Sequence, residues 1–531
     1  MAFRLPLEIL CEIIRHVELK SDLYNWCLVS RAARDFATPL FYREIWDATS
    51  IELSNERRIE NIGKFSQLPS NRLENVKKIE IRNRYLGVES EKSVNEMLGA
   101  IESLTRKLPR LEQFQWNCYL LPLTTIVPAL LQLKSLTSLC IECPMKRDIY
   151  RFVENRALEE QICKFQNLQS LTIHGIWTPN CASARRIARV LINSPKLTSL
   201  SLSLDELRCE AWERNNETII NEEDEAFWEN EEQDIEILDY FPAICREFRT
   251  PTQDPSTGKL QSVEILLPTT ALLSLTKLEL GACCILTEDI HLLTNTSVLE
   301  HIYIENVAQG IFASSSPYSF SNSALSALAK SAPKLQSIRF DTFDYDCDAT
   351  GLHLQTDFPA LDSFYVRDEY EGLVEELARS GGIEFHAAHW RRLALGNPED
   401  NQISELDDEF ETLLSGLIVN CVHLTHLRVG LRWNDMSLLL QCLTKLPQLR
   451  EIHLTVKANN ESDLQPMHDY LVQDMFQHHP GLRIASMIKS EPAGISRREC
   501  WRRRWDGLQS VSREEIHLMN RDGFPRTLTD Y

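Results

Sequence analysis

The chain has 531 residues, of which 43% are hydrophobic and 25% are charged, and these values are ordinary for a folded protein. Its formal net charge is −21, and its apolar runs fall short of the ~20 residues of a membrane-spanning helix, so we expect neither nucleic acid nor membrane as a partner. The 15 cysteines are odd in number and scattered along the chain, which is typical of buried free thiols in a reducing compartment and predicts a cytoplasmic or nuclear protein, or both.

Three short helices are predicted within residues 5–46. Because Glu8 and Glu12 interrupt the first apolar stretch, we expect no signal peptide there. Ser21 is expected to cap the second helix, and the third is expected to follow Ser30 and to break near Thr38–Pro39. The first helix carries two apolar stripes side by side, Leu7/Leu10/Ile14 and Ile9/Ile13/Val17. Three helices of this size cannot cover so much apolar surface, and the surplus favours a protein partner.

The same segment contains the motifs Leu5-Pro6, Glu8-Ile9-Leu10, Asp22-Leu23, Leu28-Val29-Ser30 and Ala37-Thr38-Pro39-Leu40-Phe41-Tyr42. In these motifs it resembles the F-box family in its fungal form, although a generic three-helix bundle remains the alternative. Many F-boxes have a tryptophan where this chain has Ala33, and Phe36 supplies aromatic bulk one turn later. The resemblance implies docking on a Skp-family adaptor, and through it on cullin and RING subunits. The residues that it assigns to adaptor binding are Leu5, Pro6, Ile9, Leu10, Ile13, Leu23, Leu28, Val29 and Phe36.

The body of the chain repeats the pattern Leu-x-x-Leu-x-Leu, with aliphatic or aromatic substitutes. In each unit the last two apolar positions alternate, as in a short strand with one buried side, and helical patterns fill the intervals. This resembles an irregular leucine-rich repeat solenoid, an α/β fold with parallel strands on a concave face and helices outside; ordinary βα units in an open sheet are the alternative. The units begin at Val76, Leu111, Leu136, Leu168, Leu197, Leu275, Leu299, Leu335, Leu361, Leu424 and Leu449, with a weak twelfth at Leu482.

These patterns predict four parts: an F-box at 1–47, a linker at 48–72, a solenoid at 73–490 and a basic tail or cap at 491–531. Two long gaps interrupt the solenoid and predict insertions at about 205–259 and about 370–420. Leu260/Val263/Ile265 fits the repeat pattern but lies too close to Leu275 for a full repeat, whereas Ile383/Phe385 suggests a worn one.

Charge is distributed unevenly along the chain. Residues 205–239 hold fifteen acidic residues and two arginines, a net charge of −13. They form either a solvated insertion or a dock for a basic partner. The basic segment 497–505, RRECWRRRW, either covers the last repeat or contacts the acidic residues.

Residues between the apolar positions of each strand are expected on the concave face. In the N-terminal half these residues are small or neutral, such as Ser170 and Thr172, whereas the C-terminal half offers charged and aromatic ones. Tyrosine and arginine dominate binding hot spots, so we hypothesise that a target protein binds the C-terminal half; ordinary solvated strand residues are the alternative. The residues of this hypothesis are His301, Tyr303, Glu305, Arg339, Asp341, Tyr365, Arg367, His426 and Arg428.

No catalytic, cofactor or metal motif rises above background in the sequence. Cys140 and Cys143 form a lone Cys-x-x-Cys on a predicted strand, and His386 and His389 have no third ligand nearby in sequence. We therefore expect no cofactor and no enzyme activity in the chain itself. The resemblance implies the substrate-recognition subunit of an SCF-type cullin–RING ubiquitin ligase that binds a target protein not identified by the sequence. The alternative is a non-catalytic scaffold that binds partners without directing their ubiquitination.

Overall fold

The structure is a computed structural model of the whole chain, and it divides into two compact units, Met1–Thr296 and Ser297–Tyr531. Each unit is described by itself. The described residues are 6–17, 20–47, 62–83, 91–118, 126–142, 158, 160–176, 181–204, 240–249, 271–281, 284, 286–304, 322–340, 361–366, 388–395, 420–432, 443–457, 475–477, 479, 481–482, 484–490, 496–504 and 507–510.

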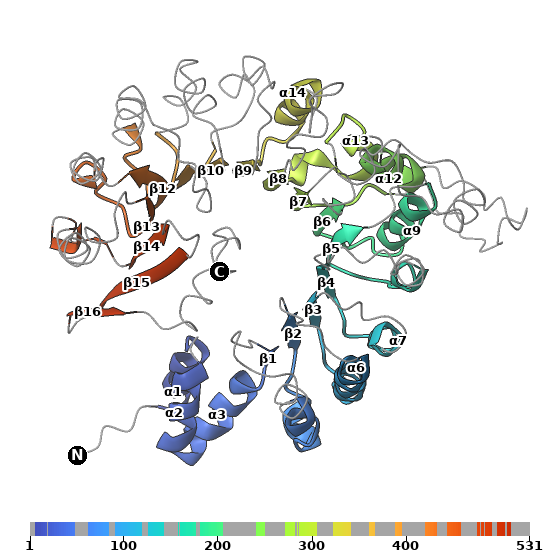
Figure 1. The fold of residues 1–531 in the computed structure, drawn as a ribbon, viewed down its shortest axis with the longest axis vertical. Helices are drawn as coiled ribbons and strands as arrows, with labels where there is room; N and C mark the ends of the chain where they lie inside the picture. The colour runs from blue at the N-terminus through green and yellow to red at the C-terminus, as the bar shows by residue number, and fades with distance from the viewer. Residues whose placement is uncertain are drawn as a thin grey trace, which may run out of the picture. The chain divides into compact units, whose positions relative to one another are not determined.

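Three helices open the first unit (Figure 1): α1 (Leu7–Arg15), α2 (Lys20–Val29) and α3 (Arg31–Phe41). They enclose a small core in which Ile14, Leu23, Ala33 and Ala37 are buried. As expected, α3 starts after Ser30, whose hydroxyl accepts a hydrogen bond from the backbone N–H of Ala33 at 3.1 Å. This cap satisfies one of the donors that the first turn of a helix leaves without a partner.

Two expected helix boundaries are wrong. The second helix begins at Lys20, so Ser21 lies inside its first turn and not before it. The third helix does not break at Thr38–Pro39, because Tyr42 N still donates to Thr38 O at 3.1 Å. Pro39 lies in the last turn of α3. Its ring removes the helical hydrogen bond that its own N–H would make, and few helical hydrogen bonds follow it before the helix ends.

The described strands of the first unit pair in parallel and in chain order. Helices connect several of them and lie on one side of the sheet (Figure 1). The strands are β1 (Glu44–Asp47), β2 (Lys78–Asn83), β3 (Gln113–Cys118), β4 (Ser138–Glu142), β5 (Ser170–Ile176), β6 (Ser199–Leu204) and β7 (Lys277–Leu280). The helices are α5 (Ser70–Leu73), α6 (Glu91–Thr105), α7 (Ile126–Leu131), α9 (Cys181–Ile192), α12 (Tyr240–Arg249) and α13 (Ile290–Leu293), with the 3-10 turn η3 (Thr296–Val298) at the boundary of the units.

The described strands of the second unit are parallel up to β14, after which two antiparallel strands follow. Helix α14 (Asn322–Ser331) precedes β9. The parallel strands are β8 (His301–Ile304), β9 (Ser337–Phe340), β10 (Ser363–Val366), β11 (Arg392–Leu395), β12 (His426–Arg432), β13 (Glu451–Lys457) and β14 (Ile484–Ser490). The antiparallel strands are β15 (Ser496–Arg504) and β16 (Gly507–Ser510).

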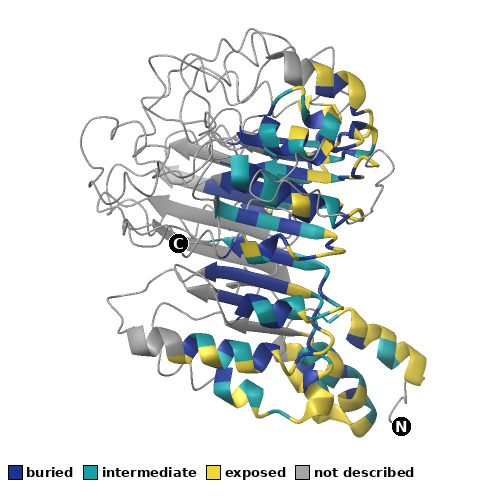
Figure 2. Cartoon of the chain, turned by 90° about the vertical axis from the view of Figure 1, so that its right-hand side faces the viewer, coloured by how far each residue is buried: buried dark blue, intermediate teal, exposed yellow. Residues whose placement is uncertain are grey.

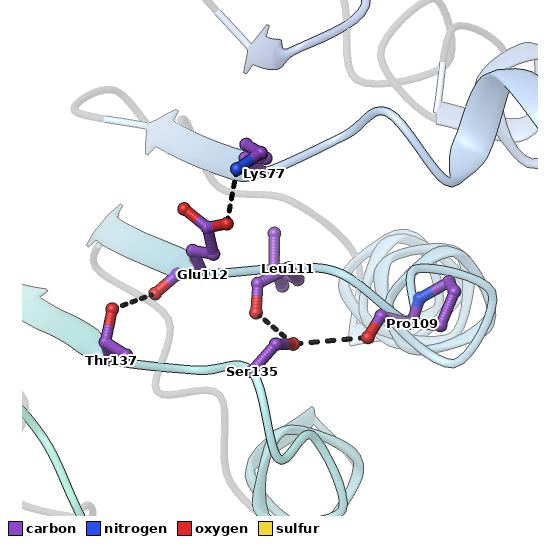
Figure 3. A network of polar contacts seen from close by, with 6 residues as sticks. All are labelled: Lys77, Pro109, Leu111, Glu112, Ser135 and Thr137. Atoms are coloured by element: carbon purple, nitrogen blue, oxygen red, sulfur yellow. Dashed lines mark hydrogen bonds and ion pairs between the residues drawn. The ribbon is translucent and has the colours of Figure 1, made fainter.

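A backbone pattern recurs at the entry to the strands. A tight turn precedes many of the strands, as where Leu111 N donates to Leu108 O at 3.2 Å. One carbonyl then accepts from two successive N–H groups of the next repeat: Glu112 O accepts from Thr137 N at 2.8 Å and from Ser138 N at 3.0 Å. In Figure 3 the hydroxyl of Thr137 donates to that same carbonyl. Equivalent double acceptors are Arg43, Lys77, Thr137, Gln169 and Thr198 in the first unit and Glu300, Gln336, Asp362, Arg391 and Thr425 in the second.

The core of each unit follows the strand alternation predicted from the sequence. On β3 the side chains of Phe114 and Trp116 are buried toward the helices, as are Leu139 and Ile141 on β4. We call the opposite side of each sheet, where the alternate residues of its strands lie, the polar face. The fold is thus mixed α/β with a parallel-strand sheet, compatible with the predicted repeat solenoid.

Two of the described parallel strands were missed by the sequence prediction. Strand β1 lies in the segment assigned to the F-box, yet it pairs with β2 and so begins the sheet. Strand β11 is the repeat hidden in the second gap, and it follows the pattern Trp390/Leu393/Leu395. The suggested pair Ile383/Phe385 lies outside the described residues. Strands β6 and β7 are hydrogen-bonded directly. The pattern Leu260/Val263/Ile265 lies outside the described residues.

The segments assigned to the linker, insertions and tail also hold regular structure. Helix α5 and a short helix at 62–66 lie within the predicted linker. The predicted acidic insertion contains α12, which packs on α9: Ser183 and Tyr240 share a hydrogen bond of 2.8 Å, and Arg185 pairs with Glu247 at 3.3 Å. The basic segment pairs antiparallel with β14, in agreement with the alternative in which it covers the last repeat.

Candidate protein-binding surfaces

The N-terminal helices expose large hydrophobic side chains, and many exposed residues lie on them (Figure 2). Of the eight large hydrophobic side chains that are exposed among the described residues, six lie on α1 and α2. Leu28 and Val29 have the greatest exposed fractions, 66% and 67%. Exposed apolar residues gathered in this way mark interaction sites more often than single ones do. We call the six residues the apolar surface: Leu7, Ile9, Ile13, Tyr24, Leu28 and Val29.

The two apolar stripes of α1 have different environments. Leu10 and Ile14 turn into the helical core, whereas Ile9 and Ile13, one turn apart, are exposed. On α2 the buried residue is Leu23, which is 4% exposed. A helix of nine or ten residues packed on one neighbour can bury only one side, so the second stripe remains on the surface.

The predicted adaptor-binding residues therefore separate into two groups. Ile9, Ile13, Leu28 and Val29 are exposed, as is Pro6 at the start of α1, whereas Leu5 lies outside the described residues. Leu23 is buried in the core of the three helices, and Leu10 and Phe36 pack against that core. Burial of Leu23 corrects its assignment, whereas Leu10 and Phe36 are partly buried and their role in adaptor binding stays a prediction. Leu7 and Tyr24, which the prediction did not include, are exposed as well.

Ala33, where a tryptophan is common in the F-box family, is fully buried. The difference from the family pattern therefore lies in the core of the helices. Phe36 packs against the same core, as the sequence suggested for its aromatic ring.

The polar face of the second unit carries several residues of the target-binding hypothesis. The guanidinium of Arg339 on β9 stacks over the ring of Tyr303 on β8, 4.1 Å from its centroid. His301 is exposed at the start of β8. The register pairs Tyr365 with Arg339, which places the two residues on adjacent strands. Glu305, Asp341 and Arg367 lie outside the described residues.

Further along this face, two histidines flank one carboxylate. Glu451 Oε2 lies 3.5 Å from His426 Nε2 and 4.0 Å from His453 Nε2. Burial by itself would raise the pKa of Glu451, but hydrogen bonds to the two imidazoles and their charge outweigh it and hold this pKa well below its ordinary value. Arg428, predicted as a contact residue, is only 5% exposed. This corrects its predicted role, because so little of its side chain is exposed for contact.

Three residues of this face escaped the prediction: Arg392, Glu451 and His453. Glu451 and His453 alternate with the apolar positions Ile452 and Leu454, so the rule used for the other strands could have named them. Arg392 was missed because β11 was missed.

The polar face of the first unit has small side chains on β4 to β6, as predicted. Its polar groups are connected: His174 Nε2 and Ser201 Oγ lie 2.6 Å apart, and Asn117 donates to Glu142 at 2.5 Å. Cys140 lies beside them, with its Sγ 3.4 Å from Glu142 Oε1. Cys143, the other half of the Cys-x-x-Cys pattern, lies outside the described residues, as do His386 and His478.

Among the described residues, the histidines, cysteines and carboxylates form no group of three or more suited to a metal ion. Of the helices that the structure describes, none combines the length and apolar character needed to cross a membrane. The eight cysteines whose side chains the structure describes are free, and five of them are buried.

Comparison with known proteins gave little. No protein-family model matches the sequence, and neither does any curated protein. Among solved structures, a chain from the crystal structure of the Rad7 and Elc1 complex in yeast is similar, with a TM-score of 0.35 and 13% identity, over 87% of this chain and 97% of that chain.

Proposed function

We propose that this chain is the substrate-recognition subunit of an SCF-type cullin–RING ubiquitin ligase. Helices α1 to α3 would form an F-box that docks on a Skp-family adaptor, and the repeats would bind a target protein. The chain itself would catalyse no step. Its contribution would be proximity, because a target held beside the ligase presents its lysines at a high effective concentration.

The observation that carries this proposal is the apolar surface. It occupies the segment whose motifs resemble the F-box, and it exposes Ile9, Ile13, Leu28 and Val29 of the residues that the resemblance assigns to adaptor binding. Exposure of these apolar side chains to water costs free energy. Their burial against a partner would recover about 25 cal/mol per Å² of apolar surface removed from water. The surrounding core of three short helices is small, which also favours stabilisation by a partner.

Affinity purification from cells with the proteasome inhibited tests the proposal. The test variant is Ile9→Ser/Leu28→Ser, which changes two exposed side chains of the apolar surface. The matched control is Leu272→Ser/Val422→Ser, which changes two large hydrophobic residues exposed elsewhere. We expect the test variant to lose the adaptor and cullin while it retains proteins bound to the repeats. The control should recover both like the wild type.

Equal recovery of cullin by the wild type and the test variant would refute the assignment of the apolar surface. The scaffold alternative makes a different prediction. A scaffold would bind its partners, yet deletion of the chain would leave their lifetimes unchanged. A ligase subunit requires at least one bound protein whose lifetime lengthens on deletion.

A further inference from the structure

We infer that a row of lysine and arginine side chains along one edge of the first unit binds an acidic segment of the target protein. This inference rests on the proposed function, in which the repeats hold a target. We call the row the basic rim. Its residues are Lys107, Arg110, Lys134, Lys164 and Lys196.

The basic rim lies where the chain turns into successive parallel strands. Each of its residues stands within four positions ahead of the first buried leucine of a repeat, before β3, β4, β5 or β6. These strands pair in order and lie ~4.8 Å apart, so the turns that carry the cations follow one another along the edge at which the strands begin. Figure 2 shows exposed residues along this edge. The leucines are Leu111, Leu136, Leu168 and Leu197.

The charge of the basic rim is not offset by the described residues. All five side chains are exposed, and none of them forms an ion pair within the part of the chain that the structure describes. Lys107 donates to the carbonyl of Ser66 at 3.0 Å, a contact that leaves its charge in place. The turns at 105–111, 132–136, 164–168 and 193–197 contain no aspartate or glutamate.

Two charged residues beside the rim already have partners. Arg106 pairs with Glu102 at 2.7 Å, so we do not count it in the rim. Glu112, which follows Arg110 by two positions, pairs with Lys77 at 2.5 Å. The potential along this edge is therefore positive, on a chain whose net charge is −21. A local positive region of this kind favours an anionic partner.

Hydrogen bonds between successive turns hold the rim in place. The hydroxyl of Ser135 donates to the carbonyls of Leu111 at 2.8 Å and Pro109 at 3.2 Å, which joins the turn before β4 to the turn before β3 (Figure 3). In the same way Asn167 N donates to Asn193 O at 2.9 Å and joins the turns before β5 and β6. The backbone that carries the cations is therefore ordered before a partner binds, which reduces the entropy lost on binding.

Long-range charge favours a short acidic segment over a nucleic acid. Repulsion from the net charge of the chain grows with the charge of the partner. At physiological ionic strength the Debye length is ~8 Å, so cations on adjacent turns reinforce one another while distant carboxylates are screened. A few carboxylates in an otherwise neutral protein meet the attraction of the rim without the repulsion that a long polyanion meets.

The residues around the cations also suit a peptide. Gln132, Gln166 and Asn167 are exposed amides in the same turns, and they can both donate to and accept from peptide groups. The one aromatic residue of these turns, Phe165, is buried and offers no ring on which a base could stack. Four of the five cations are lysines, which lack the planar fork with which arginine binds phosphate.

Fluorescence anisotropy with the full-length chain tests the inference. The probe is a labelled peptide of ten glutamates, and its comparators are a peptide of ten glutamines and a single-stranded DNA of ten nucleotides. We expect the glutamate peptide to bind most tightly, and to bind less tightly as salt is added. The variant Lys134→Gln/Lys164→Gln/Lys196→Gln should weaken this binding about tenfold, because each exposed charge contributes only a small part.

The matched control is Lys330→Gln/Lys334→Gln/Lys445→Gln, which removes the same charge from three exposed lysines of the second unit. These lysines precede β9 and β13, which are not neighbours in the sheet, so they form no continuous row. We expect the control to bind the glutamate peptide within about twofold of wild type. The single variant Lys196→Gln, with a loss of about twofold, gives an answer if the triple variant unfolds.

Three results would overturn the inference. Equal weakening by the control would leave net charge as the sole cause. Tighter binding of the DNA than of the glutamate peptide would indicate a nucleic-acid site. Binding of the glutamate peptide that responds neither to salt nor to the rim variant would place the peptide elsewhere. The basic rim shares no residue with the apolar surface, so adaptor recovery in the purification experiment reports separately on the proposed function.

Discussion

The guanidinium of Arg72 stacks over the ring of Tyr42, 5.4 Å from its centroid, and donates a hydrogen bond to the Tyr42 hydroxyl at 3.0 Å. Tyr42 follows the last residue of α3, and Arg72 lies in α5, ahead of β2. The contact thus joins the three N-terminal helices to the first repeat, beside the carbonyl of Arg43 that accepts from Lys77 N at 2.7 Å.

Loss of this contact should loosen the junction of the helices and the sheet. We expect Arg72→Ala and Tyr42→Ala to be coupled by about 0.5–1 kcal/mol in a double-mutant cycle, because both side chains are partly solvated. Amide hydrogen exchange at the end of α3 and in β1 measures the effect. Additive effects of the two substitutions would show that the stacked pair contributes nothing beyond its separate residues.

The two groups of residues on α2 should respond differently to substitution. Leu23→Ala removes a buried side chain and should destabilise the three helices by about 2–4 kcal/mol. Leu28→Ser changes a side chain that is 66% exposed and should cost less than about 0.5 kcal/mol. The protection of the α2 amides against hydrogen exchange measures the effects of both substitutions. Similar protection losses in the two variants would contradict the assignment of Leu28 to the surface.

A tryptophan at position 33, frequent in the F-box family, should not fit this chain. Ala33 is fully buried beside Ile14 and Leu23, so Ala33→Trp should overpack the core and cost about 1–3 kcal/mol. The control is Ala32→Trp, one residue earlier, where the side chain is partly exposed. Loss of exchange protection in α1 and α3 is expected for the first variant alone. Unchanged protection in both would mean that the helices can repack around the ring.

Glu451 should make the second unit sensitive to acid. Its pKa is lower in the folded chain than its ordinary value of 4.5, so its interactions stabilise the fold at pH above that value and are lost as the pH falls below it. Glu451→Gln should lower the free energy of unfolding by about 2 kcal/mol near neutral pH, and this difference should shrink as the solution is acidified.

Urea denaturation of wild type and Glu451→Gln at several acidic and neutral pH values measures this dependence. The control is Glu112→Gln, which removes the carboxylate of the half-exposed Lys77–Glu112 pair and should show a smaller effect. A difference between wild type and Glu451→Gln that stays constant with pH would refute the role given to the two histidines.

Much of the repeat architecture was predictable because each strand contributes alternate apolar residues to one core. Strand β8 illustrates this: Ile302 and Ile304 are buried, and His301 is exposed. Strand β11 follows the same rule, but Trp390 occupies the first apolar position, where the predicted repeats have leucine or valine. Strand β1 has four residues and directly follows a helix, so its pairing with β2 depends on contacts distant in sequence.

The binding surfaces were predictable only in part. On α1 the stripes Leu10/Ile14 and Ile9/Ile13 are equally apolar, and their sequence does not say which one turns inward. That choice is made by α2 and α3, whose packing buries Ile14 with Leu23 and Ala37. On the strands, alternation gave the correct face for Arg428 but not its burial, because accessibility depends on the neighbouring strands and segments.

The reversal of strand direction at β15 also bears on how the chain could change in length during evolution. From β8 to β13, each step between parallel strands uses the same two N–H donors and one carbonyl acceptor at the strand entry, so a duplicated repeat there would find the same partners as the original. The two antiparallel strands β15 and β16 follow β14 and end the run of parallel pairing. Repeats are therefore gained or lost within the array, and the antiparallel strands at the end of the sheet stay the same whatever the number of repeats.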